Sequence, residues 1–479
     1  MYKTVAGVNR GCQSAGLSEK KSLHKRQRIE QLILLLGDIG LILLSTLLTF
    51  LIRFGQFSDL LYFYTGSTAM LVSIYLISFY IFEQYALPEN GNNILYIKRS
   101  IVAVSAAGMV AMTVFYFFPD WKYGRGIFFI QMFLVCLFSS LFRICYWSIL
   151  PRTVNVRKVL FVGAGEAAKF YSDWLSQVHS HYEIVGFLDD DPQKLGQKLG
   201  QTGVLGTTDI IFDIGREKGV RDILLAITHE LRPELIRKLL LAKLRGWNIM
   251  NMTEEYERNS GRVPVRHIHD EWLVYVEGFY LNKSVVVQNL KKILDVCLSF
   301  VLIVILLPVI LITVLMIKLD STGPIIYRQK RLGKNGKPFT LFKFRSMYQD
   351  AETNGAIWAK RRDNRVTRVG KWIRILRIDE IPQLFNVFRG DMSIVGPRPE
   401  RPEFVNELEN EIPYYFIRHS VKPGITGWAQ INYPYGASVE DSLNKLEFDL
   451  YYVKNMSLWL DIRIILKTIS VILLVKGGR

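Results

Sequence analysis

Cysteine is scarce in this chain of 479 residues, which has four: Cys12, Cys136, Cys145 and Cys297. The last three lie inside apolar stretches. So few cysteines in such places indicate neither a disulfide framework nor a zinc site. The chain also lacks zinc-finger spacing and an aromatic RNA-binding signature. We therefore expect no nucleic acid among its partners.

Acidic residues are also in the minority. The chain has 43 Asp and Glu against 60 Lys and Arg, for a net charge of +17, yet 50% of its residues are hydrophobic. This combination fits an integral membrane protein whose water-exposed parts are basic. Such parts attract anionic lipid, nucleotides and phosphate.

Four apolar stretches, near 31–52, 67–87, 101–118 and 127–150, dominate the N-terminal third. Each approaches the ~20 residues that a helix needs to cross a bilayer. Lysine and arginine gather before the first stretch, between the second and third, and after the fourth. The positive-inside rule then predicts a cytoplasmic N-terminal tail over 1–30 and four transmembrane helices over 31–150, with both ends in the cytoplasm.

The pattern changes to alternating strands and helices over 155–255. An apolar strand leads into the turn Gly163–Ala168, which fits GxGxxA, and the acidic run Asp189–Asp191 follows about twenty residues later. This predicts a Rossmann-like α/β middle domain, and the turn alone suggests a dinucleotide site. The alternative is that the glycines only permit a tight strand-to-helix turn. The sequence of the turn leaves both alternatives open.

Residues 256–288 read as a linker, and a long apolar segment follows over 291–318. It is long enough to cross a bilayer, but Pro308 interrupts it and cationic residues flank both of its ends. A helix that breaks at Pro308 and returns to the cytoplasmic face satisfies both flanks. We therefore predict a re-entrant helix rather than a fifth span.

Two adjacent carboxylates, Asp379 and Glu380, stand out in a basic region. Arginines and lysines spaced by three precede them, ending with Arg374 and Arg377, and the turn Gly396–Pro399 after them carries Arg398. Neighbouring carboxylates repel each other, so their presence near phosphate-binding cations suggests a metal ion or a covalent task. The alternatives are that the carboxylates cap the following helix and that Arg398 pairs with a nearby glutamate.

A second basic segment, 328–347, contains Lys343 and Arg345 in alternation with Phe342 and Phe344. In a strand, this alternation places the cations on one face and the aromatic rings on the other. The two cations are candidates to hold a nucleotide or lipid phosphate. Plain contact with lipid headgroups is the alternative.

At this point the motifs carry a resemblance. Residues 289–479 resemble the bacterial sugar transferase family, the polyprenyl-phosphate hexose-1-phosphate transferases, in its large monotopic phosphoglycosyl transferase form. The matching motifs occur in order: STGPIIYRQKRLGKNGKPF, KFRSM, DNRVTRVGKWIR, IDEIPQLFNVFRGDMSIVGPRPE, KPGITGWAQ and FDLYYVKNMSLWLDIRIILKT. The fold class that it implies is a mixed membrane protein. It combines a four-helix transmembrane module, a Rossmann-like middle domain with a degenerate nucleotide-binding site, and an α-rich monotopic catalytic domain with a re-entrant helix over 289–479.

The resemblance implies a phosphotransferase of the bacterial inner membrane with its catalytic domain in the cytoplasm. Such an enzyme moves a hexose-1-phosphate from a UDP-sugar to undecaprenyl phosphate, releases UMP and initiates the repeat unit of an exopolysaccharide, capsule or O-antigen. The expected partners are the UDP-sugar, undecaprenyl phosphate, membrane lipids and downstream glycosyltransferases. A homodimer would give the additional domains a use.

The resemblance also assigns roles to residues. Asp379 is the expected nucleophile, forming a covalent aspartyl-phosphosugar intermediate, and Glu380 is expected to hold Mg²⁺ beside it, with Asp379 as a second ligand. The expected substrate- and phosphate-binding residues are Arg374, Arg398, Lys343, Arg345 and Asp449. Arginine forks suit phosphate oxygens, whereas the role of Asp449 stays open.

Three other functions remain as rivals. A membrane-tethered oxidoreductase or epimerase would depend on the glycine turn of the middle domain. A non-enzymatic scaffold would keep its function when Asp379 is replaced. An ordinary glycosyltransferase that acts on lipid would release UDP rather than UMP.

Overall fold

A computed structural model describes most of the chain. The described residues are 5–55, 65–85, 93–121, 123–149, 156–178, 182–268, 270–276, 278–279, 285–348, 365–434, 436 and 438–473. The expected boundary between the transmembrane and middle regions, at 150–155, lies outside this set, as do 280–284 of the expected linker. The chain separates into two compact units, 1–156 with 241–248, and 157–240 with 249–479.

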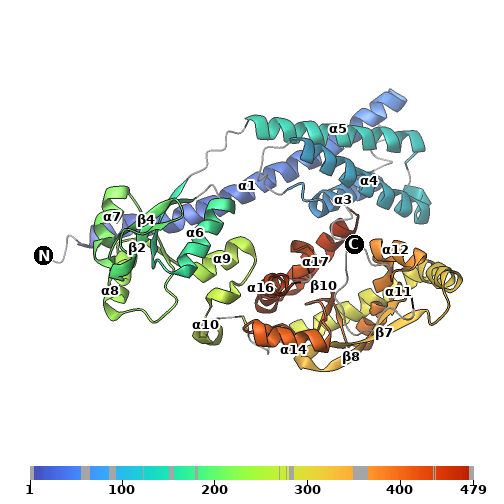
Figure 1. The fold of residues 1–479 in the computed structure, drawn as a ribbon. Coiled ribbons are helices and arrows are strands. Elements are labelled where there is room, and N and C mark those ends of the chain that lie inside the picture. The colour runs from blue at the N-terminus through green and yellow to red at the C-terminus, as the bar shows by residue number, and fades with distance from the viewer. Residues whose placement is uncertain are drawn as a thin grey trace. The chain divides into compact units, whose positions relative to one another are not determined.

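The first unit consists of apolar helices (Figure 1). They are α1 (Val5–Phe54), α3 (Thr65–Ile81), α4 (Asn93–Phe117) and α5 (Arg125–Ile149), with a short 3₁₀ helix η1 (Pro119–Trp121). Within it, α1 packs against α3 and α5, and α4 packs against the same two helices. Among the described residues of this unit, three segments are long and apolar enough to span a membrane: Ile29–Phe54, Ile97–Phe117 and Arg125–Tyr146. The chain therefore has the helices of a membrane protein.

The second expected span is shorter in the structure. Helix α3 ends at Ile81 rather than near residue 87, and the chain turns over 82–85, where Glu83 has φ 55°. The polar side chains of this turn have partners, since Gln84 donates a hydrogen bond to the Ser100 hydroxyl at 3.2 Å. Its apolar part, Gly66–Ile81, is shorter than the other spans. The residues expected to form the N-terminal tail are helical from Val5 onward.

A buried ion pair joins α1 to α5. The Arg143 guanidinium donates to both carboxylate oxygens of Asp38, at 2.9 and 2.7 Å, and both side chains are fully buried. The guanidinium also lies over the Phe79 ring of α3. A charge buried among apolar helices is tolerated only when it is paired, so this contact specifies how the three helices meet.

A six-stranded sheet forms the centre of the middle region, with the order β3-β4-β2-β1-β5-β6. Its strands are β1 (Arg157–Val162), β2 (Tyr182–Leu188), β3 (Lys198–Leu199), β4 (Thr202–Gly206), β5 (Asp222–Leu225) and β6 (Asn248–Asn251). β1 runs parallel to β2 and β5, and β2 runs parallel to β4, whereas β3 is antiparallel. The mixed α/β region expected from the sequence is therefore present.

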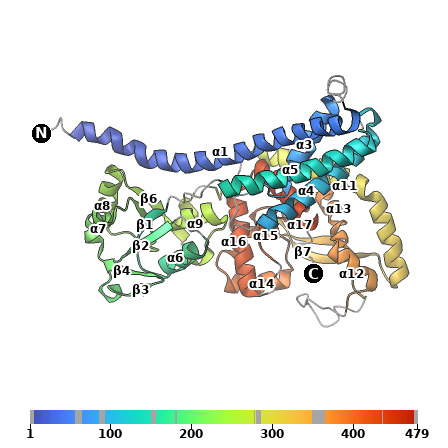
Figure 2. The same ribbon diagram turned by 90° about the horizontal axis from the view of Figure 1, so that it is seen from above.

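Helices cover the two faces of this sheet. They are α6 (Glu166–Val178), α7 (Ile211–Lys218), α8 (Pro233–Leu244) and α9 (Met252–Ser260), and short 3₁₀ helices occur at η2 (Pro192–Lys194) and η3 (Thr208–Ile210). Figure 2 shows α7 and α8 on one side of the sheet and α6 and α9 on the other. Tyr171 of α6 and Tyr256 of α9 lie in the same core as Phe161 and Phe187 of the sheet.

The region after α9 packs into the C-terminal part of the chain. It contains η4 (Val265–His267) and α10 (Asp270–Tyr275). Val263, Val265 and Ile268 are buried in one core with Leu446 and Leu450. The stretch that the sequence suggested as an irregular linker thus contributes side chains to a hydrophobic core.

The C-terminal part is mostly helical, with two small sheets. Its helices are α11 (Val285–Asp320), α12 (Arg368–Ile375), α13 (Gln383–Arg389), α14 (Pro402–Glu411), α15 (Trp428–Asn432), α16 (Val439–Asn455) and α17 (Leu458–Leu473), with 3₁₀ helices η5 (Lys334–Gly336), η6 (Ile378–Glu380) and η7 (Tyr415–Ser420). The antiparallel hairpin is β7 (Ile326–Leu332) and β8 (Pro338–Phe344), and β9 (Ser393–Val395) pairs in parallel with β10 (Gly424–Thr426).

Helix α11 is the most apolar element of this part. It runs over 36 residues with Pro308 inside it, and the segment Val286–Asp320 is long enough to span a membrane, yet only 11% of its most apolar stretch is buried. Exposed aliphatic side chains such as Ile305 and Leu311 lie on both sides of the proline. A surface of this kind needs an apolar environment around it.

Candidate functional site

The acidic pair lies in a tight turn between two helices. Helix α12 ends at Ile375, and Arg377 then adopts a left-handed conformation with φ 59°. The 3₁₀ turn η6 follows and carries Asp379 and Glu380, which are both buried. A non-glycine residue in the left-handed region is strained, and such strain is concentrated at functional sites.

Glu380 is surrounded by cations. Its Oε1 accepts a hydrogen bond from Arg398 Nη2 at 2.6 Å and from Lys343 Nζ at 3.1 Å, and Arg377 Nη1 lies 3.8 Å away. Burial alone would raise the pKa of Glu380, but Arg398 and Lys343 outweigh it and hold that pKa well below its usual range. Glu380 is therefore a fixed, ionised carboxylate.

Asp379 has a different environment. Its Oδ2 lies 4.0 Å from Lys343 Nζ, and in the described part of the chain its carboxylate makes no hydrogen bond. Burial raises the pKa of Asp379, and the neighbouring Glu380 charge adds to this effect against the attraction of Lys343. One carboxylate of the pair is thus held by cations, while the other keeps its oxygens unbonded.

The hairpin β7–β8 supplies Lys343, one of the cations that bind Glu380. Lys343 lies opposite Tyr327 in the antiparallel register, so it shares a face with Tyr327, Gln329 and Arg331. Burial lowers the pKa of Lys343, while the charge of Glu380 opposes that shift. Within β8, Lys343 and Phe342 point to opposite faces, as the alternation predicted, and Lys343 lies beside Glu380; its expected contact with phosphate stays a prediction.

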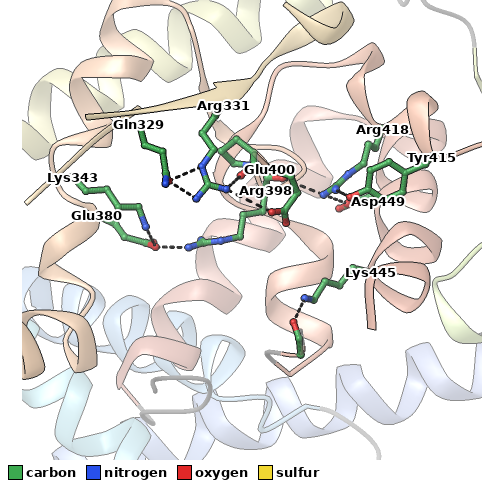
Figure 3. A network of polar contacts seen from close by, with 12 residues as sticks. Gln329, Arg331, Lys343, Glu380, Arg398, Glu400, Tyr415, Arg418, Lys445 and Asp449 are labelled. Carbon is green, nitrogen blue, oxygen red and sulfur yellow. Dashed lines mark hydrogen bonds and ion pairs between the residues drawn. The ribbon is translucent and has the colours of Figure 1, made fainter. Parts of the chain in front are cut away.

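The turn after β9 supplies the second cation that binds Glu380. Arg398 reaches back to Glu380 from Gly396–Pro399, as Figure 3 shows. Glu400, which the sequence left open as a partner of Arg398, lies 3.6 Å from Arg331 Nη1. Among the described residues, neither carboxylate of the pair accepts a hydrogen bond from a backbone N–H at the start of α13, so the pair does not cap that helix.

Two of the expected phosphate-binding arginines do not contact the acidic pair. Arg345 follows β8 and donates to the Ser321 hydroxyl at 2.8 Å, near the end of α11. Arg374 is half-exposed on α12, where its side chain has no hydrogen bond or ion pair to another described residue. Their expected contacts with substrate phosphate stay predictions.

Asp449 is buried in α16, and its Oδ2 lies 2.8 Å from Arg418 Nη2. Sequence reasoning missed both Arg418 and the inward position of Arg331. The hairpin register could have identified Arg331, because it lies on the same face as Lys343. Arg418 belongs to a 3₁₀ helix without side-chain periodicity, so the sequence carried no signal for it.

The donor set around Glu380 suits a hard divalent cation. The site offers two adjacent carboxylates. Magnesium typically binds one or two carboxylates and completes its coordination shell with water and substrate phosphate. Among the described residues there is no group of three or more His, Cys, Asp or Glu side chains that could hold a metal ion. An ion here would therefore need ligands from a phosphate-bearing substrate or from water.

In the glycine turn of the middle region, an acidic side chain occupies a backbone N–H group that a bound phosphate would use. The Oδ2 atom of Asp189 accepts a hydrogen bond from Ala164 N at 2.7 Å and from Lys194 Nζ at 3.1 Å. Hydrogen bonds from these donors lower the pKa of Asp189, although burial opposes them. The backbone amide that would face a phosphate at this turn thus has an internal partner.

Comparison with known proteins places the C-terminal part in a family. The profile described as "Bacterial sugar transferase" matches residues 286–475. A "UDP-N-acetylgalactosamine-undecaprenyl-phosphate N-acetylgalactosaminephosphotransferase" of Aeromonas hydrophila is 44% identical over 51% of this chain and 56% of that protein. An "Undecaprenyl-phosphate glucose phosphotransferase" of Komagataeibacter xylinus is 48% identical over 66% of this chain and 58% of that protein.

A shorter relative is matched over most of its length. The "Putative undecaprenyl-phosphate N-acetylgalactosaminyl 1-phosphate transferase" of Bacillus subtilis (strain 168) is 53% identical over 35% of this chain and 87% of that protein. The chain spans a little over half the length of the Aeromonas and Komagataeibacter relatives. The chain belongs to the bacterial sugar transferase family.

Proposed function

We propose that this protein transfers a hexose-1-phosphate from a UDP-sugar to undecaprenyl phosphate and releases UMP. The observation that carries the proposal is the difference within the acidic pair: cations hold Glu380, while the carboxylate of Asp379 has no hydrogen bond in the described part of the chain. A carboxylate whose oxygens are free, beside a cluster of phosphate-binding cations, suits nucleophilic attack on phosphorus.

In the first step, an Asp379 oxygen attacks the phosphorus that bears the sugar. A bond forms between that oxygen and phosphorus, the bond from phosphorus to the bridging oxygen breaks, and the bridging oxygen leaves with UMP. Lys343 and Arg398 lie where they can bind the diphosphate oxygens and offset the charge of the leaving group. The product is an aspartyl-phosphosugar.

In the second step, a phosphate oxygen of undecaprenyl phosphate attacks the same phosphorus. The acyl-phosphate bond breaks, the Asp379 carboxylate is restored, and a polyprenyl diphosphate sugar is formed. Asp379 is the nucleophile of the first step and the leaving group of the second, so the two substrates need not bind together. This exchange predicts ping-pong kinetics.

A magnesium ion fits the proposed site. Glu380 would hold it, with Asp379 beside it, because the cations around Glu380 keep that carboxylate ionised. When bound, the ion would supply charge neutralisation at the diphosphate. Lys343 and Arg398 already bind Glu380 Oε1, so they would share this carboxylate with the metal.

We further propose that α11 enters the membrane and returns, which keeps the catalytic part in the cytoplasm at the inner membrane. Near its start, Lys291 Nζ lies 2.6 Å from Asp461 of α17; at its end, Asp320 accepts a hydrogen bond from Val369 N of α12 at 3.0 Å. Both ends of the helix are therefore tied to the same unit. A straight helix of its 36 residues would be about 54 Å long, which supports a bend at Pro308.

Exposed aromatic side chains support this placement. Trp372 of α12 and Phe388 of α13 are more than half exposed, and Trp459 is exposed at the start of α17. Tryptophan favours the level of the lipid headgroups, where its ring is apolar and its N–H is hydrated. An active site at that level can meet a water-soluble nucleotide sugar and a lipid acceptor.

The first experiment is an assay of the released nucleotide. Purified protein is incubated with undecaprenyl phosphate, Mg²⁺ and a panel of UDP-sugars. Release of UMP together with a lipid diphosphate sugar supports the proposal. Release of UDP would favour an ordinary glycosyltransferase, and no turnover with any sugar contradicts the proposal.

The second experiment isolates the first step. Without the lipid acceptor, labelled UMP should exchange into the UDP-sugar, because the covalent intermediate reverses. Asp379→Asn should abolish this exchange. Asp391→Asn is a matched control, since Asp391 lies 3.5 Å from the exposed Arg389 and, among the described residues, makes no hydrogen bond or ion pair with the acidic pair, Lys343 or Arg398. Exchange that persists in Asp379→Asn would remove Asp379 as the nucleophile.

A further inference from the structure

The turn that presents Arg398 is held through its backbone carbonyls. Hydrogen bonds reach Pro397 O from Gly424 N at 2.9 Å, Arg398 O from Arg418 Nη2 at 3.1 Å, Pro399 O from Arg331 Nη1 at 3.0 Å and Glu400 O from Leu332 N at 3.1 Å. The preceding Gly396 is packed so closely that an added Cβ would lie 2.3 Å from the carbonyl oxygen of Lys422. The backbone around Arg398 therefore has little freedom.

One of these four donors is a buried charge. Arg418 of η7 is 5% exposed, and its guanidinium binds Arg398 O, the Tyr415 hydroxyl and the carboxylate of Asp449. Asp449 comes from α16, about thirty residues further along the chain, and is 1% exposed. A buried guanidinium is stable only when its charge is compensated, and Asp449 supplies that compensation.

Asp449 does not contact the acidic pair directly. Within the described residues, no hydrogen bond or ion pair joins it to Asp379, Glu380 or Lys343. At 1% exposure it also offers no surface that a substrate can touch. Figure 3 shows how its influence can travel: Asp449 contacts Arg418, Arg418 contacts the backbone of Arg398, and the Arg398 guanidinium contacts Glu380.

We infer that Asp449 and Arg418 are positioning residues, which hold Arg398 against Glu380 without touching the substrate. The effect on turnover rests on the proposed transferase function, whereas the effect on the backbone of the turn does not. The inference gives Asp449 a structural task in the site instead of a contact with phosphate.

The consequence of losing the pair follows from the geometry. Without the Asp449 charge, Arg418 keeps the weaker attraction of the partly exposed Glu400, and its guanidinium shifts toward water. Arg398 O then loses its donor, and the Arg398 guanidinium shifts away from its 2.6 Å contact with Glu380. A displacement of about 1 Å at a catalytic group lowers turnover by about a hundredfold.

A double-mutant cycle separates positioning from direct contact. Asp449→Asn should lower kcat/KM by about ten- to a hundredfold, and Arg398→Ala should lower it at least as much. If Asp449 acts through Arg398, the double variant is no worse than Arg398→Ala alone. Losses that multiply would show that Asp449 acts independently and would overturn the inference.

A paired apolar replacement separates positioning from general stability. Arg418→Met combined with Asp449→Leu removes both charges together, which buried ion pairs often tolerate. Its Tm should recover relative to Asp449→Asn, while kcat/KM stays low because Arg398 O still lacks its donor. Recovery of both quantities would reduce the pair to a purely structural contact and refute the inference.

Hydrogen exchange tests the inference without any turnover. Asp449→Asn should speed amide exchange in the peptide covering 395–401, whereas Glu440→Gln should leave it unchanged. Glu440 lies on the same helix but pairs with Arg266 at the surface. Unchanged exchange in Asp449→Asn overturns the inference even if the protein releases no UMP, an outcome that would separately reject the proposed function.

Discussion

The two carboxylates of the acidic pair should differ sharply in what they contribute to stability. Glu380 faces Arg398 at 2.6 Å, Lys343 at 3.1 Å and Arg377 at 3.8 Å, whereas Asp379 has Lys343 at 4.0 Å. Replacing Glu380 with glutamine removes the anion that these cations share. Replacing Asp379 with asparagine removes a like charge from beside Glu380.

The expected magnitudes follow from burial. Removing one partner of a buried ion pair costs about 3–5 kcal/mol, because the other charge is left uncompensated. The side chains of Lys343 and Arg398 are 20% and 29% exposed. Glutamine also keeps an acceptor oxygen, so we expect a loss of about 2–3 kcal/mol for Glu380→Gln. Asp379→Asn should change the stability by about 1 kcal/mol or less, with a gain as the favoured sign, because burial already disfavours its charge.

Thermal unfolding of the purified protein in detergent measures both effects, without substrate or Mg²⁺. For a cooperative unit of roughly 200 residues, a loss of about 2–3 kcal/mol lowers Tm by about 5–10 °C. Asp391→Asn serves as the surface control. A Glu380→Gln variant as stable as the wild type, or an Asp379→Asn variant that is less stable than Glu380→Gln, would refute the assignment of the cations to Glu380.

Two further predictions concern other elements. Burial raises the pKa of Glu447 in α16 to about 7, so its contribution to stability is complete below about pH 4.5 and is lost as the pH rises through 7. Glu447→Gln should therefore be more stable than the wild type at pH 8, by up to about 3 kcal/mol, and equally stable near pH 4.5. In Glu440→Gln, the stability difference from the wild type should not change with pH. A Tm difference between Glu447→Gln and the wild type that stays constant from pH 4.5 to 8 contradicts the assignment. Pro308→Ala restores the backbone donor inside α11 and should favour a straight helix, which would reduce UMP release and alter the labelling of single cysteines placed at residues 290 and 319. Unchanged activity and labelling would show that the proline does not determine the path of α11.

Hydropathy predicted the longest membrane helices well, because about twenty apolar residues in a row have few alternatives to a spanning helix. The prediction failed at the end of α3. There, Glu83 and Gln84 follow Phe82, and the chain turns to bind Ser100 and Arg99 of the next helix. The hydropathy of a window cannot show that these polar residues have partners 16 positions away.

For the site, the sequence predicted features that depend on local geometry, whereas the roles of the site residues stay predictions. The alternation along β8 predicted the face of Lys343, and the rigid turn predicted a fixed Arg398. The Arg418–Asp449 pair was beyond reach, because its members come from a 3₁₀ helix and a helix that meet only when the C-terminal part closes. The partner of a buried charge is therefore determined by how these distant elements pack together in the folded protein.

Adjacency in the sequence also concealed why the two carboxylates differ. A 3₁₀ helix turns by about 120° per residue, so consecutive side chains point in well-separated directions. In η6, this rotation brings Glu380 into contact with Arg398 and leaves the Asp379 carboxylate without a hydrogen bond among the described residues. In an α-helix the two side chains would point only about 100° apart, and the backbone would rise less per residue. Both carboxylates would then lie closer together and compete for Lys343. The strained conformation of Arg377 begins the turn in which one carboxylate binds cations while its neighbour has no hydrogen bond among the described residues.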